Sequence, residues 1–125
     1  MNYLLDTHTF LWWLSDSDQL SRQAKKIISD SDNRIFMSCA SQWEIAIKVS
    51  INRLTFPMDE METELVKNGF ELLNITTPHI NQTTSLPLHH RDPFDRMLIA
   101  QAQSESLILI SKDHIFPEYD INLAW

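Results

Sequence analysis

The chain has 125 residues, a net charge of −7, 43% hydrophobic residues and a single cysteine, Cys39. A chain of this size buries enough surface to fold as one domain without a disulfide or a structural metal. The lone cysteine excludes a disulfide framework and a cysteine zinc site, and the lone glycine, Gly69, excludes the glycine-rich phosphate loops.

In chain order, short apolar runs alternate with amphipathic segments. The pattern predicts a strand at 3–5, helices at 10–14 and 21–29, a strand at 34–37, helices at 41–51 and 58–68, a strand at 71–75, helices opening at 77 and at 92, and strands at 107–110 and 121–123. Such alternation favours crossover connections and a parallel sheet. We therefore expect residues 1–125 to form a single α/β domain, a three-layer α/β/α arrangement around a short central parallel sheet.

The sequence carries no sign of a membrane span or of export. The longest apolar runs are about five residues long, and the first residues combine an early Asp6 with no basic segment. We therefore expect a cytoplasmic protein, which also fits the lone cysteine. The acidic balance argues against nucleic-acid binding, because phosphate contacts need Lys and Arg, unless several carboxylates hold metal.

Acidic residues gather where predicted strands end and the next helices begin. Asp6 follows the first strand, Glu44 lies early in the helix after the second, Asp92 and Asp95 open a later helix, and Asp113 follows the fourth strand. Because the carboxyl ends of parallel strands share one edge, we expect these carboxylates to converge. Such a cluster needs a cation, and its oxygen ligands suit Mg²⁺ or Mn²⁺. A divalent cation there would activate water against a phosphodiester.

Each acid also has a purely structural interpretation. Asp6 is also consistent with a solvated strand end, and Asp113 with a turn cap. Glu44 completes a Ser-x-x-Glu capping box, and Asp92 before a proline is typical of a helix N-cap. Asp95, at the third helical position, also favours the helix dipole. The inference of a metal site therefore rests on the joint placement of these acids.

Other residue types are weaker candidates. Cys39 has no base partner in the sequence, and we expect a structural role for it. The histidines lack the spacing of zinc ligands, and we expect them on the surface or in loops: His8, His79, His89, His90 and His114. Trp12 and Trp13 are adjacent, so they cannot both point inward, and one of them is expected to face a groove or a partner.

Four stretches together resemble the PIN-domain family, and within it the VapC-type toxins of bacterial toxin–antitoxin pairs. They are residues 4–8 (LLDTH), 41–48 (SQWEIAIK), 90–102 (HRDPFDRMLIAQA) and 110–113 (ISKD). The resemblance implies an endoribonuclease dependent on Mg²⁺ or Mn²⁺ with four site acids, which match Asp6, Glu44, Asp95 and Asp113. Asp6 and Asp95 would be the principal metal ligands, and Glu44 and Asp113 would act directly or through water. Asp92 is an additional acid of the subgroup.

The resemblance also implies partners: an RNA substrate, a second copy of the chain in a homodimer, and a cognate antitoxin whose C-terminal segment covers the groove. Basic residues near the site in sequence are candidates for RNA phosphate contacts: Lys48, Arg53, Arg91, Arg96 and Lys112. Two alternatives stay open. One is a metal-dependent phosphatase or phosphotransferase, although the Asp-Thr-His at residues 6–8 lacks the second acid of haloacid-dehalogenase-like enzymes. The other is a non-catalytic partner-binding module on the same fold.

Overall fold

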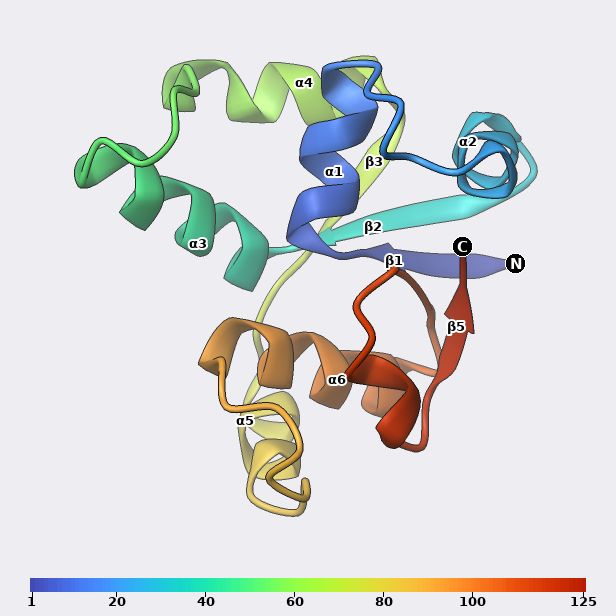
Figure 1. The fold of residues 1–125 in the computed structure, drawn as a ribbon, viewed down its shortest axis with the longest axis vertical. Helices are drawn as coiled ribbons and strands as arrows, with labels where there is room; N and C mark the ends of the chain where they lie inside the picture. The colour runs from blue at the N-terminus through green and yellow to red at the C-terminus, as the bar shows by residue number, and fades with distance from the viewer.

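The computed structural model describes residues 1–125, and its centre is a parallel sheet of five strands (Figure 1). The strands are β1 (Asn2–Leu5), β2 (Arg34–Ser38), β3 (Phe70–Leu73), β4 (Ile108–Ile110) and β5 (Asn122–Ala124). They lie in the order β3-β2-β1-β4-β5, and every neighbouring pair is parallel. The predicted parallel sheet is therefore confirmed.

Helices cover both faces of the sheet, which gives the predicted α/β/α layers (Figure 1). One layer contains α1 (Thr7–Leu14), α2 (Arg22–Ser29), α3 (Cys39–Ser50) and α4 (Met61–Lys67), and the other contains α5 (Thr77–Thr83) and α6 (Pro93–Glu105). Two short 3-10 helices are η1 (Met58–Glu60) and η2 (Phe116–Glu118). Each layer has its own core: Leu5, Phe10 and Met37 are buried in the first, and Leu98 and Phe116 in the second. No helix is long and apolar enough to cross a membrane.

The strand order places a crevice beside β1. The chain passes from β1 outward to β2 and β3, then returns to the other side of β1 to form β4 and β5. Ligands of open parallel sheets bind at such a reversal, beyond the carboxyl ends of the strands. Leu5 pairs with Ile110, so the next residues of the two strands, Asp6 and Ser111, lie side by side at this point.

Two helices begin earlier than the sequence predicted. Helix α1 starts at Thr7 because Asp6 caps it, with Oδ1 accepting from the backbone N–H of Thr9 at 2.8 Å. Helix α3 starts at Cys39, where the hydroxyl of Ser38 accepts from a backbone N–H at 3.0 Å. The predicted capping box over residues 41–44 is therefore wrong, because Glu44 already lies inside the helix and is not needed to cap it.

The predicted helix over 58–68 is divided into η1 and α4, and a left-handed residue closes it as expected. Gly69 has φ +71°, a conformation that glycine adopts without steric cost. Helix α5 begins behind a capping box in which Thr76 and His79 bond each other's backbone N–H. His79 is buried within α5, and its Nε2 lies 2.8 Å from Glu105, so the expectation of a surface or loop position is wrong for this histidine.

Candidate active site

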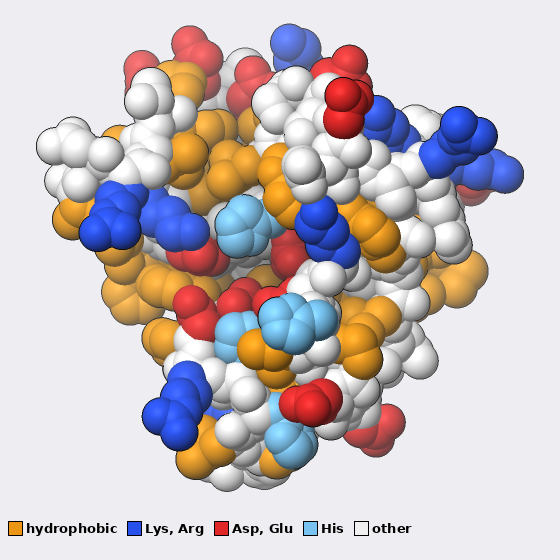
Figure 2. All heavy atoms as spheres, viewed as in Figure 1, with side chains coloured by type: hydrophobic (Ala, Val, Ile, Leu, Met, Phe, Trp, Pro, Cys, Tyr) orange, Lys and Arg blue, Asp and Glu red, His pale blue; other side chains and the backbone are white.

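An open cleft of about 430 Å³ lies at the carboxyl ends of β1 and β4. Its walls come from the starts of α1 and α6, from α3 and from the loop after β4. Five carboxylates line it: Asp6, Glu44, Asp92, Asp95 and Asp113. Figure 2 shows acidic and histidine side chains gathered in a hollow of this face, with Lys and Arg on its rim. The structure thus brings together every acid that the sequence analysis selected.

Asp6 is the most enclosed of these acids, with 7% of its surface exposed. Its Oδ1 caps α1, and its Oδ2 accepts a short hydrogen bond from the hydroxyl of Ser111, at the end of β4. Burial raises the pKa of Asp6, and the hydrogen bonds from Ser111 and Thr9 oppose that rise. Each oxygen keeps a further lone pair, so the carboxylate is both fixed and able to accept a cation.

Glu44 is held in the cleft by α1 and by its own helix. The hydroxyl of Thr7 donates to Glu44 Oε1 at 2.6 Å, and the ammonium of Lys48 lies 3.1 Å from Oε2, one helical turn away. Glu44 is buried, with 8% exposed. Buried charges are tolerated when they are paired and hydrogen-bonded, and Glu44 meets both conditions.

The two acids at the start of α6 have different contacts. Asp92 is the N-cap, as its position before Pro93 predicts: Oδ1 accepts from the backbone N–H groups of Phe94 at 2.8 Å and Asp95 at 3.2 Å. The side chain of Asp95 faces the cleft instead. Burial, followed by the charges of Asp92 and Glu44, raises the pKa of Asp95 to about 7, while His90 opposes the rise.

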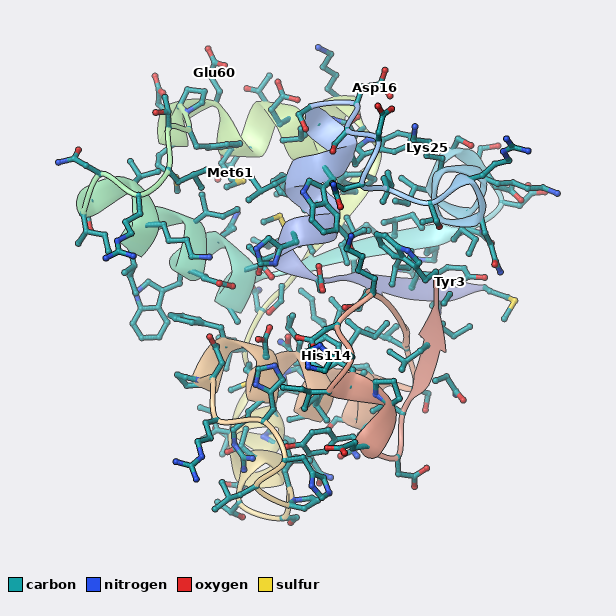
Figure 3. All side chains as sticks on the ribbon, in the orientation of Figure 1. Tyr3, Asp16, Lys25, Glu60, Met61 and His114 are labelled. Carbon is teal, nitrogen blue, oxygen red and sulfur yellow. The ribbon has the colours of Figure 1, made fainter.

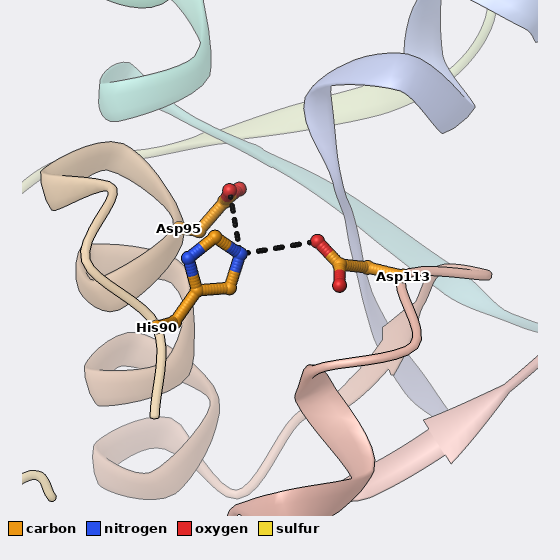
Figure 4. A group of neighbouring side chains, drawn as sticks. All are labelled: His90, Asp95 and Asp113. Atoms are coloured by element: carbon orange, nitrogen blue, oxygen red, sulfur yellow. Dashed lines mark hydrogen bonds and ion pairs between the residues drawn. The ribbon is translucent and has the colours of Figure 1, made fainter. Parts of the chain in front are cut away.

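Asp113 reaches the cleft from the loop after β4. Its Oδ1 accepts from the backbone N–H of Ile115 at 2.8 Å, which makes the local turn predicted as its alternative role. Its Oδ2 lies 3.1 Å from Nε2 of His90, and the same nitrogen lies 3.1 Å from Oδ2 of Asp95 (Figure 4). Asp113 therefore belongs to the acid cluster by its place in the cleft and also by its contact with the imidazole of His90.

Sequence reasoning missed three residues that hold the acids in place, Thr7, Ser111 and His90. The sequence did contain a signal for Thr7 and Ser111. Each is a polar residue within two positions of a predicted strand end, which is the criterion that selected Asp6. His90 lies two residues before the Asp-Pro that opens α6, and it was set aside because its spacing does not fit zinc. Its loop position was correct, but its side chain is 12% exposed and lies in the cleft.

The rim of the cleft combines aromatic and basic groups. Trp12 lines the cleft with the ammonium of Lys112 4.7 Å above its ring, whereas Trp13 packs on Phe70 and donates to Asn68. The expectation that one of the two tryptophans faces a groove is confirmed. His114, labelled in Figure 3, also lines the cleft from the loop after β4.

Carboxylate oxygens dominate this cleft, and the raised pKa values of Asp6 and Asp95 show how poorly the site holds its own negative charge. A bound divalent cation would offset that charge, and hard cations such as Mg²⁺ and Mn²⁺ prefer oxygen ligands. The residues present therefore fit such a cation. Cys39 does not suit a nucleophile, because burial raises the pKa of its thiol.

Comparisons with known proteins agree with this architecture. The sequence model of the PIN domain matches residues 3–122. No curated protein sequence gives a significant match. Among solved structures, VapBC2 from Rickettsia felis bound to a promoter DNA fragment has a TM-score of 0.75 at 14% identity, covering 100% of this chain and 99% of that chain. DNA-bound VapBC from Salmonella typhimurium has a TM-score of 0.71 at 15% identity, covering 99% and 97%.

A toxin–antitoxin complex from Klebsiella pneumoniae has a TM-score of 0.65 at 20% identity, covering 98% of this chain and 96% of that chain. At these identities the structural likeness establishes the fold. The family match spans nearly the whole sequence, with the candidate site inside it. The chain belongs to the PIN-domain family.

Proposed function

We propose that the chain is a metal-dependent endoribonuclease, the toxin of a VapC-type toxin–antitoxin pair that acts in the cytoplasm, with residues 1–125 as one domain. The convergence of five carboxylates in one cleft of a PIN fold carries this proposal. Asp6 and Asp95 are the direct ligands of Mg²⁺ or Mn²⁺, and Glu44 and Asp113 complete the set directly or through water.

The chain's own residues prepare this site. Ser111 and the start of α1 fix the Asp6 carboxylate, and Thr7 fixes Glu44, so both acids keep their positions before a cation arrives. Fixed ligands lower the free-energy cost of assembling the metal site. The bound cation supplies activation of water and stabilisation of the leaving oxygen of a phosphodiester.

The basic residues proposed to contact RNA phosphates fall into two groups, according to whether their side chains are already bound within the protein. Arg96 donates to the carbonyl oxygens of Thr83, Leu86, Pro87 and His90, so its guanidinium anchors the loop before α6 and we withdraw it as a phosphate contact. Lys48 and Lys112 line the cleft. The exposed Arg53 and Arg91 complete the proposed phosphate-binding set.

Metal removal tests the activity directly. The purified chain is expected to cleave single-stranded RNA with Mg²⁺ or Mn²⁺ and to stop when EDTA is added, because the carboxylates alone repel the phosphate. Cleavage is followed on a labelled oligonucleotide, with an Asp6→Asn variant as the control for contaminating nuclease. Full cleavage by a demonstrably metal-free preparation refutes the proposal, and release of phosphate from small phosphoesters without RNA cleavage favours the phosphatase alternative.

An exposed apolar strip on α3 supports the proposed protein partners. It consists of Trp43 and Ile47 in α3 and Ile51 at its C-cap, which recur at intervals of four residues and are 62%, 37% and 57% exposed. Contiguous exposed apolar side chains of this kind are typical of interaction surfaces. The sequence analysis expected one of Trp12 and Trp13 to face a groove or a partner, but Trp12 lines the cleft and Trp13 packs on Phe70, so the strip on α3 is the better candidate for a protein partner.

We therefore expect the isolated chain to be a homodimer through this strip, and Trp43→Asp to yield a monomer. Light scattering at micromolar concentration measures the mass of both proteins. Ile80→Asp on α5, which replaces another half-exposed apolar residue, is the matched control and should leave the dimer intact. A wild-type monomer contradicts the homodimer. Co-purification with the product of the neighbouring gene tests the antitoxin separately.

A further inference from the structure

His90 joins two acids that come from different parts of the chain. Asp95 belongs to α6 and Asp113 to the loop after β4, and Nε2 of His90 lies 3.1 Å from one carboxylate oxygen of each (Figure 4). The three atoms lie within 4.8 Å of one another. On spacing alone, this group resembles a metal centre with one histidine and two aspartate ligands.

The second ring nitrogen of His90 argues against that interpretation. Nδ1 faces the backbone N–H of Asp92 at 3.4 Å and accepts from it. A nitrogen that accepts a hydrogen bond carries no proton, so the hydrogen-bond partners assign the proton of the neutral ring to Nε2. An imidazole that binds metal through Nε2 needs the opposite arrangement, with Nδ1–H donating to an acceptor.

The surroundings of His90 hold the ring in this orientation. Its side chain packs against Phe116, with ring centroids 5.6 Å apart. Its backbone N–H donates to the hydroxyl of Tyr119 at 2.7 Å, and its carbonyl accepts from Arg96 at 3.2 Å. These contacts fix the backbone and the plane of the ring, and turning the ring over would carry Nε2 away from Asp95 and Asp113 and Nδ1 away from the N–H of Asp92.

We propose that His90 is a positioning residue of the acid cluster and not a metal ligand. Its Nε2–H donates to the carboxylate of Asp113 and lies 3.1 Å from that of Asp95, and so holds the loop after β4 against the start of α6. The inference deepens the proposed function, because it leaves the cation an all-oxygen ligand set. One imidazole thereby determines both where Asp113 lies and which atoms are offered to the metal.

Spectroscopy distinguishes the two roles of His90. In the metal-free protein, ¹⁵N NMR of the imidazoles is expected to show His90 protonated at Nε2 and not at Nδ1. In the Mn²⁺-loaded protein, pulsed EPR is expected to show no coupling from a directly bound ¹⁴N. A strong nitrogen coupling that disappears in His90→Gln would identify His90 as a ligand and overturn the proposal.

Metal binding tests the positioning itself. His90→Ala should weaken Mn²⁺ binding by about tenfold or more, the usual loss when a partner of a ligand is removed. His90→Gln keeps an N–H donor and should recover most of the affinity. His89→Ala, at the exposed neighbouring histidine that packs on Tyr119 and contacts none of the site acids, should leave the Mn²⁺ affinity unchanged. Calorimetry measures all three, with the melting temperature as a check on folding.

Wild-type affinity in His90→Ala overturns the proposal, and so does a His90→Gln variant that folds but binds as weakly as His90→Ala. The proposed nuclease function can be refuted independently of this role of His90. A protein that shows the expected tautomer and the expected Mn²⁺ affinities, but cleaves no RNA, refutes the nuclease activity and leaves the role of His90 standing.

Discussion

Asp95→Asn is expected to abolish RNA cleavage and to raise the melting temperature of the metal-free protein. The carboxylate is enclosed beside Asp92 and Glu44, which raises its pKa to about 7, so its ionised form is destabilised by the fold. Asparagine removes that charge with little change in shape. It also removes a proposed metal ligand, so activity and stability should move in opposite directions.

Asp92→Asn is the matched comparison, three residues earlier on the same helix. Asparagine keeps the oxygen that accepts from the N–H groups of Phe94 and Asp95, so fold and most of the cleavage should persist. Asp92→Ala loses the cap and should cost about 1 kcal/mol of stability. Cleavage rate at saturating Mn²⁺ and melting temperature are measured for all three variants.

The outcomes separate the roles of the two acids. If Asp92→Asn is inactive and Asp95→Asn stays active, the third site acid has been assigned to the wrong residue. If both variants fold normally and both are inactive, Asp92 belongs to the metal site as well as capping α6. A clear fall in the melting temperature of metal-free Asp95→Asn would contradict the inference that the fold destabilises the ionised form of Asp95.

Local signals predicted the elements and the Asp92 cap, because both depend on residues close in sequence. The apolar runs set the strands, and an aspartate before a proline sets the start of α6. The same reasoning failed at Glu44, where a Ser-x-x-Glu pattern looked like a cap. The helix begins at Cys39, two residues earlier than predicted, because Ser38 at the end of β2 caps it. Glu44 therefore lies on the second turn and accepts a hydrogen bond from Thr7 of α1.

The contacts that fix the acids were not predictable from spacing. Thr7 meets Glu44 across 37 residues, and Ser111 meets Asp6 across 105 residues. Both pairs exist because β1 lies beside β2 and β4, and strand order is a property of the folded sheet. The contacts of His90 with the two acids depend in addition on how the loop after β4 approaches α6. The sequence therefore indicated which acids converge, but not which neutral groups position them.

The stability of the metal-free protein is expected to fall as the pH rises from about 4 to about 7. In the unfolded chain Asp95 loses its proton near its ordinary pKa of 3.8, whereas in the fold it keeps the proton until its pKa of about 7. The folded state therefore binds the extra proton between these values, and this contribution to stability is lost with rising pH. The raised pKa of the buried Asp6 acts in the same direction.

Added Mn²⁺ should reverse this loss, because the cation competes with the proton for the same carboxylates. The increase in melting temperature on adding Mn²⁺ should therefore be larger at pH 8 than at pH 6. Asp95→Asn is the control that removes the contribution of Asp95, so its metal-free melting temperature should depend less on pH than that of the wild type. Melting curves in EDTA and in Mn²⁺ across this range measure both effects. A wild-type protein that gains stability from pH 5 to pH 8 in EDTA, relative to Asp95→Asn, would contradict this prediction. It would mean that the fold stabilises the ionised form of Asp95, and that burial and the neighbouring acids do not raise its pKa.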